Sequence, residues 1–270
     1  MISFNVIELA LQSDPLKTYL VVPWYMEKYL NLLNLRYDQL SGDEKMCFNV
    51  KPGTHIYWSI LDDGLRGENF QRLDYVFQKL VGGACKMRNQ SSTAADYGSA
   101  EMRNRKLAVF INRKGTRELS ADVFKAIDDV LVAEKDWQVK YFYGNESTDE
   151  TICLFSKANF IFGFHGAGFV NAYFSTVPAV VVFEMSFYDE KQDKVWRFNS
   201  WELASAKKMT VVPYMLNPDQ YLGPGSAEKG QGLKHVLLNR TDIFNIQQYV
   251  RLAIRGQQYT LRSLTMPTKF

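Results

Sequence analysis

The sequence contains few cysteines, and they follow no pattern that binds metal or builds a disulfide framework. Cys47, Cys85 and Cys153 are odd in number and lie far apart, so their spacing matches no zinc site. Cys153 lies in an apolar helical stretch, where we interpret it as an ordinary core residue. The simplest inference from these cysteines is a reducing compartment.

Long apolar segments are also absent. No run approaches the roughly 18 apolar residues that a membrane-spanning helix requires. The first residues lack the charged-then-apolar pattern of a secretory signal peptide. We therefore expect a soluble protein with no membrane span in this chain, located in the cytoplasm or in another reducing compartment.

Charge is nearly balanced and scattered along the chain. The net charge is +3 and apolar residues interrupt the short basic groups, so we do not expect nucleic acid as a partner. No Asp-x-Asp element occurs in a setting that suggests Mg²⁺ or Mn²⁺. Asp62-Asp63 is an adjacent pair, and the side chains of Asp128-Asp129 would diverge by about 100° on a helix. We therefore expect no metal and no other cofactor.

The chain does have a hydrophobic fraction of 46%, enough for a globular core, and an aromatic fraction of 14%. Its predicted strands and helices alternate, which is typical of an α/β protein with parallel sheets. Residues 82–98 are small, polar and rich in turn formers, so we interpret them as a loop or interdomain linker. We predict strands over residues 18–22, 55–60, 107–112, 138–143, 210–212 and 235–238, and helices over residues 24–35, 69–80, 99–103, 120–133, 149–156 and 242–255.

Residues 159–184 carry the strongest functional signal. An apolar run ends in His165-Gly166-Ala167-Gly168, an amphipathic stretch follows, and a second apolar run closes on Glu184. This order predicts a strand, a tight turn, a short helix and a second strand. Backbone N–H groups at the start of such a helix stabilise an anion such as a diphosphate, and small residues let that anion approach the main chain.

A packing turn between two buried strands is the alternative interpretation, and it would be favoured for a Gly-Ala-Gly turn alone. The polar residues His165, Asn171 and Glu184 change that balance, because the carboxyl ends of parallel strands border the crevice where open α/β sheets bind ligands. Arg113 and Arg117 follow the end of another predicted strand. These cations can offset the charge of a single diphosphate.

Residues 106–214 resemble glycosyltransferase family 61. The signature of that family is a strand ending in His-Gly-Ala-Gly, then Asn and Phe, Pro, and an apolar strand ending in Glu. Upstream, the family carries a strand followed by two arginines, which match Arg113 and Arg117. Residues 23–35 look like the family's tryptophan–lysine–tyrosine helix. The signature positions in this chain are His165, Gly166, Ala167, Gly168, Asn171, Phe174, Pro178 and Glu184.

The resemblance implies a GT-B-like α/β fold, with two Rossmann-like domains and a C-terminal helix that crosses back to the first. Residues 1–98 would form the acceptor-side domain. Residues 99–270 would bind the nucleotide sugar and carry the terminal crossing helix. The alternation of elements by itself indicates only the α/β class.

The resemblance also implies roles for single residues. Arg113 and Arg117 would hold the donor diphosphate against the turn. Glu184 would accept hydrogen bonds from ribose hydroxyls, with an ion-paired or capping carboxylate as its alternative. His165 would donate to a phosphate or the sugar, or serve as the base, with a structural hydrogen bond as its alternative. The donor site would be completed by Gly166, Ala167, Gly168 and Asn171.

The catalytic base is assigned to the first domain. Asp63 follows the predicted strand over residues 55–60 and is our first choice, with Asp62 and Glu68 as alternatives. Three residues that follow the signature could line the donor pocket, where a tryptophan offers a stacking face: Trp196, Asn199 and Trp201.

These features lead to an inverting glycosyltransferase that moves a sugar from a UDP-sugar to a hydroxyl of a glycan acceptor. Xylose is favoured because a small chain leaves little room for an elaborate pocket, and N-acetylglucosamine and arabinose are the alternatives. A non-catalytic nucleotide- or glycan-binding module is the rival function, because residues 3–6 lack the His and Asp that the family carries there. A dehydrogenase or methyltransferase is disfavoured, since no Gly-x-Gly-x-x-Gly turn follows the first strand.

Overall fold

The computed structural model describes residues 18–23, 31–33, 37–40, 55–58, 76–86, 105–112, 118–134, 136–189, 194–195, 209–217, 221 and 235–256. Contacts between residues group the chain into two compact units. The first unit comprises Met1–Ser92 with Ser147–Cys153, and the second comprises Thr93–Glu146 with Leu154–Phe270.

The first unit contains a small parallel sheet of three strands. These are β1 (Thr18–Pro23), β2 (Tyr37–Leu40) and β3 (His55–Trp58), in the spatial order β2-β1-β3. Both neighbours pair with β1 in parallel. Parallel pairing requires a crossover connection between successive strands, so this unit follows the same α/β principle that the alternation predicts.

A helix over residues 76–86 belongs to the same unit and differs from the prediction. Val76, Leu80 and Ala84 are fully buried at helical spacing. The helix therefore continues beyond residue 80, and the predicted loop is wrong over residues 82–86. Gly83, within the extended part of the helix, lies close to Leu32. A Cβ atom on Gly83 would lie 2.9 Å from the carbonyl oxygen of Leu32, so only a glycine lets the two segments approach this closely.

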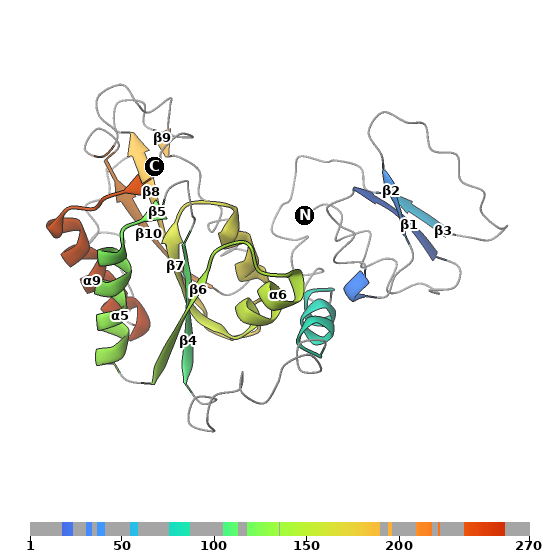
Figure 1. Ribbon diagram of the computed structural model, residues 1–270, viewed down its shortest axis with the longest axis horizontal. Helices are drawn as coiled ribbons and strands as arrows, with labels where there is room; N and C mark the ends of the chain where they lie inside the picture. The colour runs from blue at the N-terminus through green and yellow to red at the C-terminus, as the bar shows by residue number, and fades with distance from the viewer. Residues whose placement is uncertain are drawn as a thin grey trace. The chain divides into compact units, whose positions relative to one another are not determined.

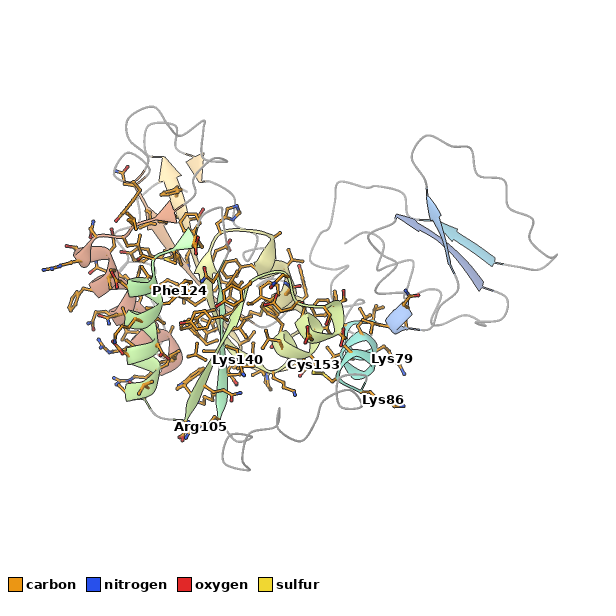
Figure 2. All side chains as sticks on the ribbon, viewed as in Figure 1. Lys79, Lys86, Arg105, Phe124, Lys140 and Cys153 are labelled. Atoms are coloured by element: carbon orange, nitrogen blue, oxygen red, sulfur yellow. A yellow bond between two sulfur atoms is a disulfide. The ribbon has the colours of Figure 1, made fainter. Side chains whose placement is uncertain are left out.

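Two of the three cysteines form a disulfide. Cys85 on the helix over residues 76–86 is bonded to Cys153, which Figure 2 labels on α6 (Thr148–Ser156). The interpretation of Cys153 as an ordinary core residue is therefore wrong. The expectation of a reducing compartment also loses its basis, because disulfides persist mainly in oxidising environments.

The second unit is built on a parallel sheet of five strands (Figure 1). The spatial order is β10-β8-β7-β4-β6, and β9 (Lys194–Val195) adds an antiparallel pairing to β8. β5 (Glu118–Leu119) and β11 (His235–Val236) form a separate short parallel pair. The five parallel strands are β4 (Lys106–Ile111), β6 (Trp137–Phe142), β7 (Ala158–Phe164), β8 (Val181–Asp189) and β10 (Thr210–Leu216).

The strand order shows where this sheet reverses direction. β4 is the first strand of this sheet along the chain but lies inside the sheet, with β6 on one side and β7, β8 and β10 on the other. The chain therefore leaves β4 in one direction and later returns to continue in the other. The reversal falls between β4 and β7, which makes this unit a doubly wound, Rossmann-like α/β sheet.

Helices α5 (Ala121–Ala133) and α9 (Arg240–Ile254) pack against each other and lie on one side of the sheet (Figure 1). They share one apolar core with alternate residues of the strands. The C-terminal helix was predicted to cross back to the first unit. The buried residues Ile246, Val250 and Ala253 of α9 belong to the core of the second unit, and a crossing back to the first unit stays a prediction.

The sequence predicts capping residues at the starts of two helices, α6 and α5. Ser147 and Glu150 form the predicted capping box of α6, with the Glu150 N–H donating to Ser147 Oγ at 3.3 Å and the Ser147 N–H donating to Glu150 Oε2 at 3.1 Å. Ser120 occupies the predicted N-cap position of α5, but its side chain makes no capping hydrogen bond. Within the described part of the chain, every helix is too short or too polar to cross a membrane.

Candidate functional site

The candidate site lies at the carboxyl ends of β4 and β7, where the sheet reverses. Ile111 at the end of β4 is in register with Gly163 of β7, one residue before that strand ends. The N–H of Asn112 donates to the carbonyl of Phe142 at 2.9 Å, so the chain leaving β4 is held against β6. Ligands of doubly wound sheets bind in the crevice at this kind of reversal.

Two glycines allow the segments at this edge to approach closely. A Cβ atom on Gly163 would lie 2.9 Å from Ile111 Cβ and 3.0 Å from the Ile111 carbonyl oxygen. A Cβ atom on Gly168 would lie 2.9 Å from Ile111 Cγ2. Close packing is therefore one reason for Gly168, as the packing-turn interpretation requires, and the ligand contact of this residue stays a prediction.

The turn after β7 leads directly into a short helix, as predicted. This helix is the 3₁₀ segment η3 (Ala167–Phe174), and it begins next to the ends of β4 and β7. Its apolar side is anchored by Phe169, Ala172, Tyr173 and Phe174, all buried. Within the turn Gly166 is buried, whereas Ala167 is exposed and Asn171 is half-buried.

His165 and Glu184 form the polar centre of this region. Nδ1 of His165 lies 3.1 Å from Oε1 of Glu184. The N–H of His165 also donates to the carbonyl of Met185 at 2.7 Å, which fixes the main chain of the turn to β8. His165 is 8% exposed and Glu184 is 0% exposed. A buried carboxylate is stable only when hydrogen bonds replace its water, so its contact with the imidazole is structurally important.

Glu184 lies in a different local setting from the one that the sequence predicts. β8 runs from Val181 to Asp189, so Glu184 is inside the strand and not at its end. The strand continues because Met185, Ser186 and Phe187 are buried as well. Of the two predicted environments for Glu184, the described contact is that of a carboxylate paired with a neighbouring side chain. The ribose contact stays a prediction.

Asn112 is a residue of this edge that sequence reasoning missed. Its side-chain oxygen Oδ1 is buried and has no hydrogen-bond partner among the described residues. Buried polar atoms normally have partners, so an oxygen of this kind at a strand end marks a candidate contact residue. Its position directly after β4 is the signal that could have identified it, because polar residues at strand ends are the usual ligand contacts of such sheets.

Six predicted site residues lie on the turn after β7, on η3 and on β8: His165, Gly166, Ala167, Gly168, Asn171 and Glu184. The structure brings two of them, His165 and Glu184, into direct contact. Arg113 and Arg117, which follow β4, lie outside the described residues, as does Asp63 with its alternatives Asp62 and Glu68. The same holds for Trp196, Asn199 and Trp201. Their roles remain predictions.

No three or more His, Cys, Asp or Glu side chains cluster as potential metal ligands in the described ranges. The polar groups described at this edge include one imidazole, one carboxylate, the amides of Asn112 and Asn171, and main-chain groups. Such a set can bind an anion, orient a sugar or transfer a proton.

A protein-family model described as Glycosyltransferase 61 matches residues 16–182 of the chain. The match covers more than half of the sequence and includes β4, the turn after β7 and η3. It ends two residues before Glu184. No curated protein matches the chain.

Proposed function

Because this chain belongs to glycosyltransferase family 61, we propose that it is an inverting enzyme that transfers a sugar from a UDP-sugar to a hydroxyl of a glycan acceptor. Membership of the family implies glycosyltransferase activity and therefore a donor and an acceptor substrate. The UDP-sugar donor, the inverting course and the sugar itself form the proposal.

One observation carries this proposal. The turn His165–Gly168 opens η3 at the carboxyl ends of β4 and β7, where the doubly wound sheet reverses. Main-chain N–H groups at the start of a helix favour a negative charge, and this edge is where such sheets bind nucleotides. The leaving group of a UDP-sugar is a diphosphate, which needs this kind of stabilisation as the glycosidic bond breaks.

Arg113 and Arg117 supply the cations in the proposed donor site. Arg113 comes two residues after Ile111, whose side chain lies against the site of Gly168. From this end of β4 an arginine can reach a diphosphate bound at the turn and donate two parallel hydrogen bonds. In this arrangement no metal is needed, because the helix start and the arginines offset the charge of the diphosphate.

The proposed enzyme uses the GT-B division of labour. Residues 99–270 bind the donor on the five-stranded sheet. Residues 1–98 form the acceptor-side domain, and their parallel order β2-β1-β3 is compatible with a second Rossmann-like unit. Xylose is the favoured donor sugar, and N-acetylglucosamine and arabinose are the alternatives.

The decisive experiment is a panel of UDP, UDP-xylose, UDP-N-acetylglucosamine and UDP-arabinose, tested for thermal stabilisation and for hydrolysis. A ligand that binds the native state adds RT ln(1 + [L]/Kd) to the free energy of unfolding, about 2.7 kcal/mol at 100 times Kd. We expect UDP and one UDP-sugar to stabilise the protein, and that sugar to be turned over. NMR of the anomeric proton of the product then tests inversion.

The other results separate the rival functions. Stabilisation without turnover, with or without oligosaccharide acceptors, would identify a non-catalytic binding module. Full loss of turnover in excess EDTA, restored by Mn²⁺, would contradict the metal-free arrangement. No response to any uridine nucleotide would overturn the proposed donor class.

A further inference from the structure

We infer that Glu184 is a positioning residue that acts through His165, and that this pair accepts the proton of the acceptor hydroxyl during sugar transfer. The inference rests on the proposed function, and it names the residue that prepares the base. It also gives Glu184 a role other than the ribose contact suggested by family resemblance.

The geometry of the pair supports this role. His165 Nδ1 lies 3.1 Å from Glu184 Oε1, which is hydrogen-bond distance. The residues come from two elements, the turn after β7 and the middle of β8, and β7 and β8 are directly paired. A second link, the 2.7 Å hydrogen bond from the His165 N–H to the Met185 carbonyl, fixes the backbone beside the imidazole. His165 is therefore held at two points, its main-chain N–H and its imidazole ring.

The location of the carboxylate supports it as well. Glu184 is fully buried, and its partners in register are Gly163 and Pro213, neither of which carries a charge. β7 and η3 contain no Asp, Glu, Lys or Arg, β4 has Lys106 at its opposite end, and β8 has Asp189 five residues further on. Among the residues of β4, β7, β8 and η3, Glu184 is thus a charged side chain described in contact with the imidazole.

The contact has a chemical consequence for the ring. An ionised carboxylate only accepts hydrogen bonds, so the proton of a neutral His165 is held on Nδ1. The other nitrogen, Nε2, then carries the lone pair and can act as a base. A buried carboxylate also stabilises the positive charge that appears on the ring when Nε2 takes a proton. Orientation and charge compensation are therefore both supplied by Glu184.

The transfer step balances with these two residues. The oxygen of the acceptor hydroxyl attacks C1 of the donor sugar, and the bond between C1 and the diphosphate oxygen breaks. The bonding electrons leave with UDP, and the hydroxyl proton moves to Nε2 of His165. The products are the glycoside, UDP and a protonated imidazole next to Glu184, which releases its proton to solvent before the next cycle.

The main test is a double-mutant cycle with Glu184→Gln and His165→Ala. Glu184→Gln keeps the shape of the side chain but removes its charge, so we expect kcat to fall by at least about 10²-fold with UDP affinity unchanged. In the His165→Ala background, Glu184→Gln should cause little further loss, because residues that act as a unit are not additive. Glu134→Gln on the surface is the matched control, and it should leave kcat unchanged.

A spectroscopic measurement on the unaltered protein supports the same test if Glu184→Gln does not fold. The chain has three histidines, so ¹⁵N spectra of the rings can be assigned with His55→Gln and His235→Gln variants. We expect neutral His165 with its proton on Nδ1. A neutral ring with its proton on Nε2 would overturn the inference.

Three kinetic results would also overturn it: unchanged kcat in Glu184→Gln, loss of UDP affinity in place of kcat, or independent losses in the double mutant. A large loss of kcat in Asp63→Asn with a normal Glu184→Gln would return the base to the first unit. Failure of the proposed function has a different signature, because an inactive native protein can still show the predicted tautomer of His165.

Discussion

At the residue scale, the edge of the sheet near His165 combines tight packing with buried polar atoms. Ile111 is in contact range of the two glycine positions, and Asn112 directly after it has a buried side-chain oxygen without a described partner. On the other side of β7, Glu184 is paired with His165. Packing residues and polar residues therefore lie within a few positions of each other at this edge. For this reason a Gly-Ala-Gly turn alone does not show whether the turn serves packing or ligand binding.

A diphosphate at the His165 turn needs cations, and the proposed cations are Arg113 and Arg117. Arg113→Ala and Arg117→Ala should each weaken UDP binding by roughly 1.5–3 kcal/mol, the range for hydrogen bonds to charged groups. Isothermal titration calorimetry measures the effect directly. Lys125→Ala is a suitable control, because this exposed lysine pairs with Asp129 on the surface of α5. Unchanged UDP affinity in both arginine variants would show that the diphosphate binds elsewhere.

A pair of glycine substitutions tests the packing argument. Gly163→Ala should destabilise the protein by about 1–3 kcal/mol, because the added methyl overlaps Ile111 and the strands cannot separate without loss of pairing. Gly82→Ala is the matched comparison in the helix over residues 76–86, where an added Cβ has no neighbour within 4 Å. There we expect a gain of about 0.5–1 kcal/mol from the better helix former. Urea unfolding of both variants measures whether each substitution lowers or raises the free energy of unfolding. Equal changes in the two variants would contradict the packing explanation.

At the scale of elements, the start of α9 is tied to the end of the sheet through Asp242. Tyr214 of β10 donates its hydroxyl hydrogen to Asp242 Oδ1 at 2.8 Å, and Tyr221 donates to the other carboxylate oxygen. Asn239 caps the helix by accepting from the Asp242 N–H at 2.8 Å. These contacts connect the last helix to β10, and they help to explain why α9 stays with the second unit.

This network predicts an alkaline limit to stability. Burial, followed by the hydrogen bond to Asp242, raises the pKa of Tyr214 above its ordinary value of 10.0. Because the folded pKa is the higher one, the contribution is fully present below pH 10 and is lost as the pH rises toward the folded pKa. The free energy of unfolding should therefore fall above pH 10. Tyr214→Phe should flatten that decline, and parallel declines in the two proteins would exclude this phenol as the cause.

At the scale of the whole molecule, the disulfide is the feature that most changes expectations about the environment of the chain. Cys85 and Cys153 are separated by 68 residues, so the bond closes a long loop in the unfolded chain. Such a cross-link lowers the entropy of the unfolded state and stabilises the native state by about 2–4 kcal/mol. Disulfides of this kind are typical of proteins that fold in oxidising environments.

Reduction should therefore lower the stability of the protein. We expect dithiothreitol to decrease Tm, and Cys85→Ser or Cys153→Ser to reproduce the decrease. Neither variant should then respond further to the reductant. Thiol titration of protein folded under oxidising conditions should find one free cysteine. Three titratable thiols in the native protein would contradict the disulfide.

The predictions that succeeded from sequence depend on short-range patterns. The strand, turn, short helix and strand of residues 159–184 follow from apolar runs and small residues, and the capping box of α6 follows from Ser147 and Glu150. The family motif also lies in this continuous segment. These features were accessible because hydrophobic period, capping and turn chemistry act within a few residues of the chain.

Tertiary structure decided what depends on partners far apart in the chain. His165 and Glu184 are 19 residues apart, and Cys85 and Cys153 are 68 residues apart. The apolar stripe of α9 does not by itself specify the unit on which the helix packs. The sequence shows that such side chains are present, but burial and pairing depend on strand register and on which faces meet. The sequence by itself determined the parallel α/β class and the location of the signature turn. Only the folded sheet determined that the carboxylate of Glu184 faces an imidazole, because β7 and β8 must pair before those two side chains can meet.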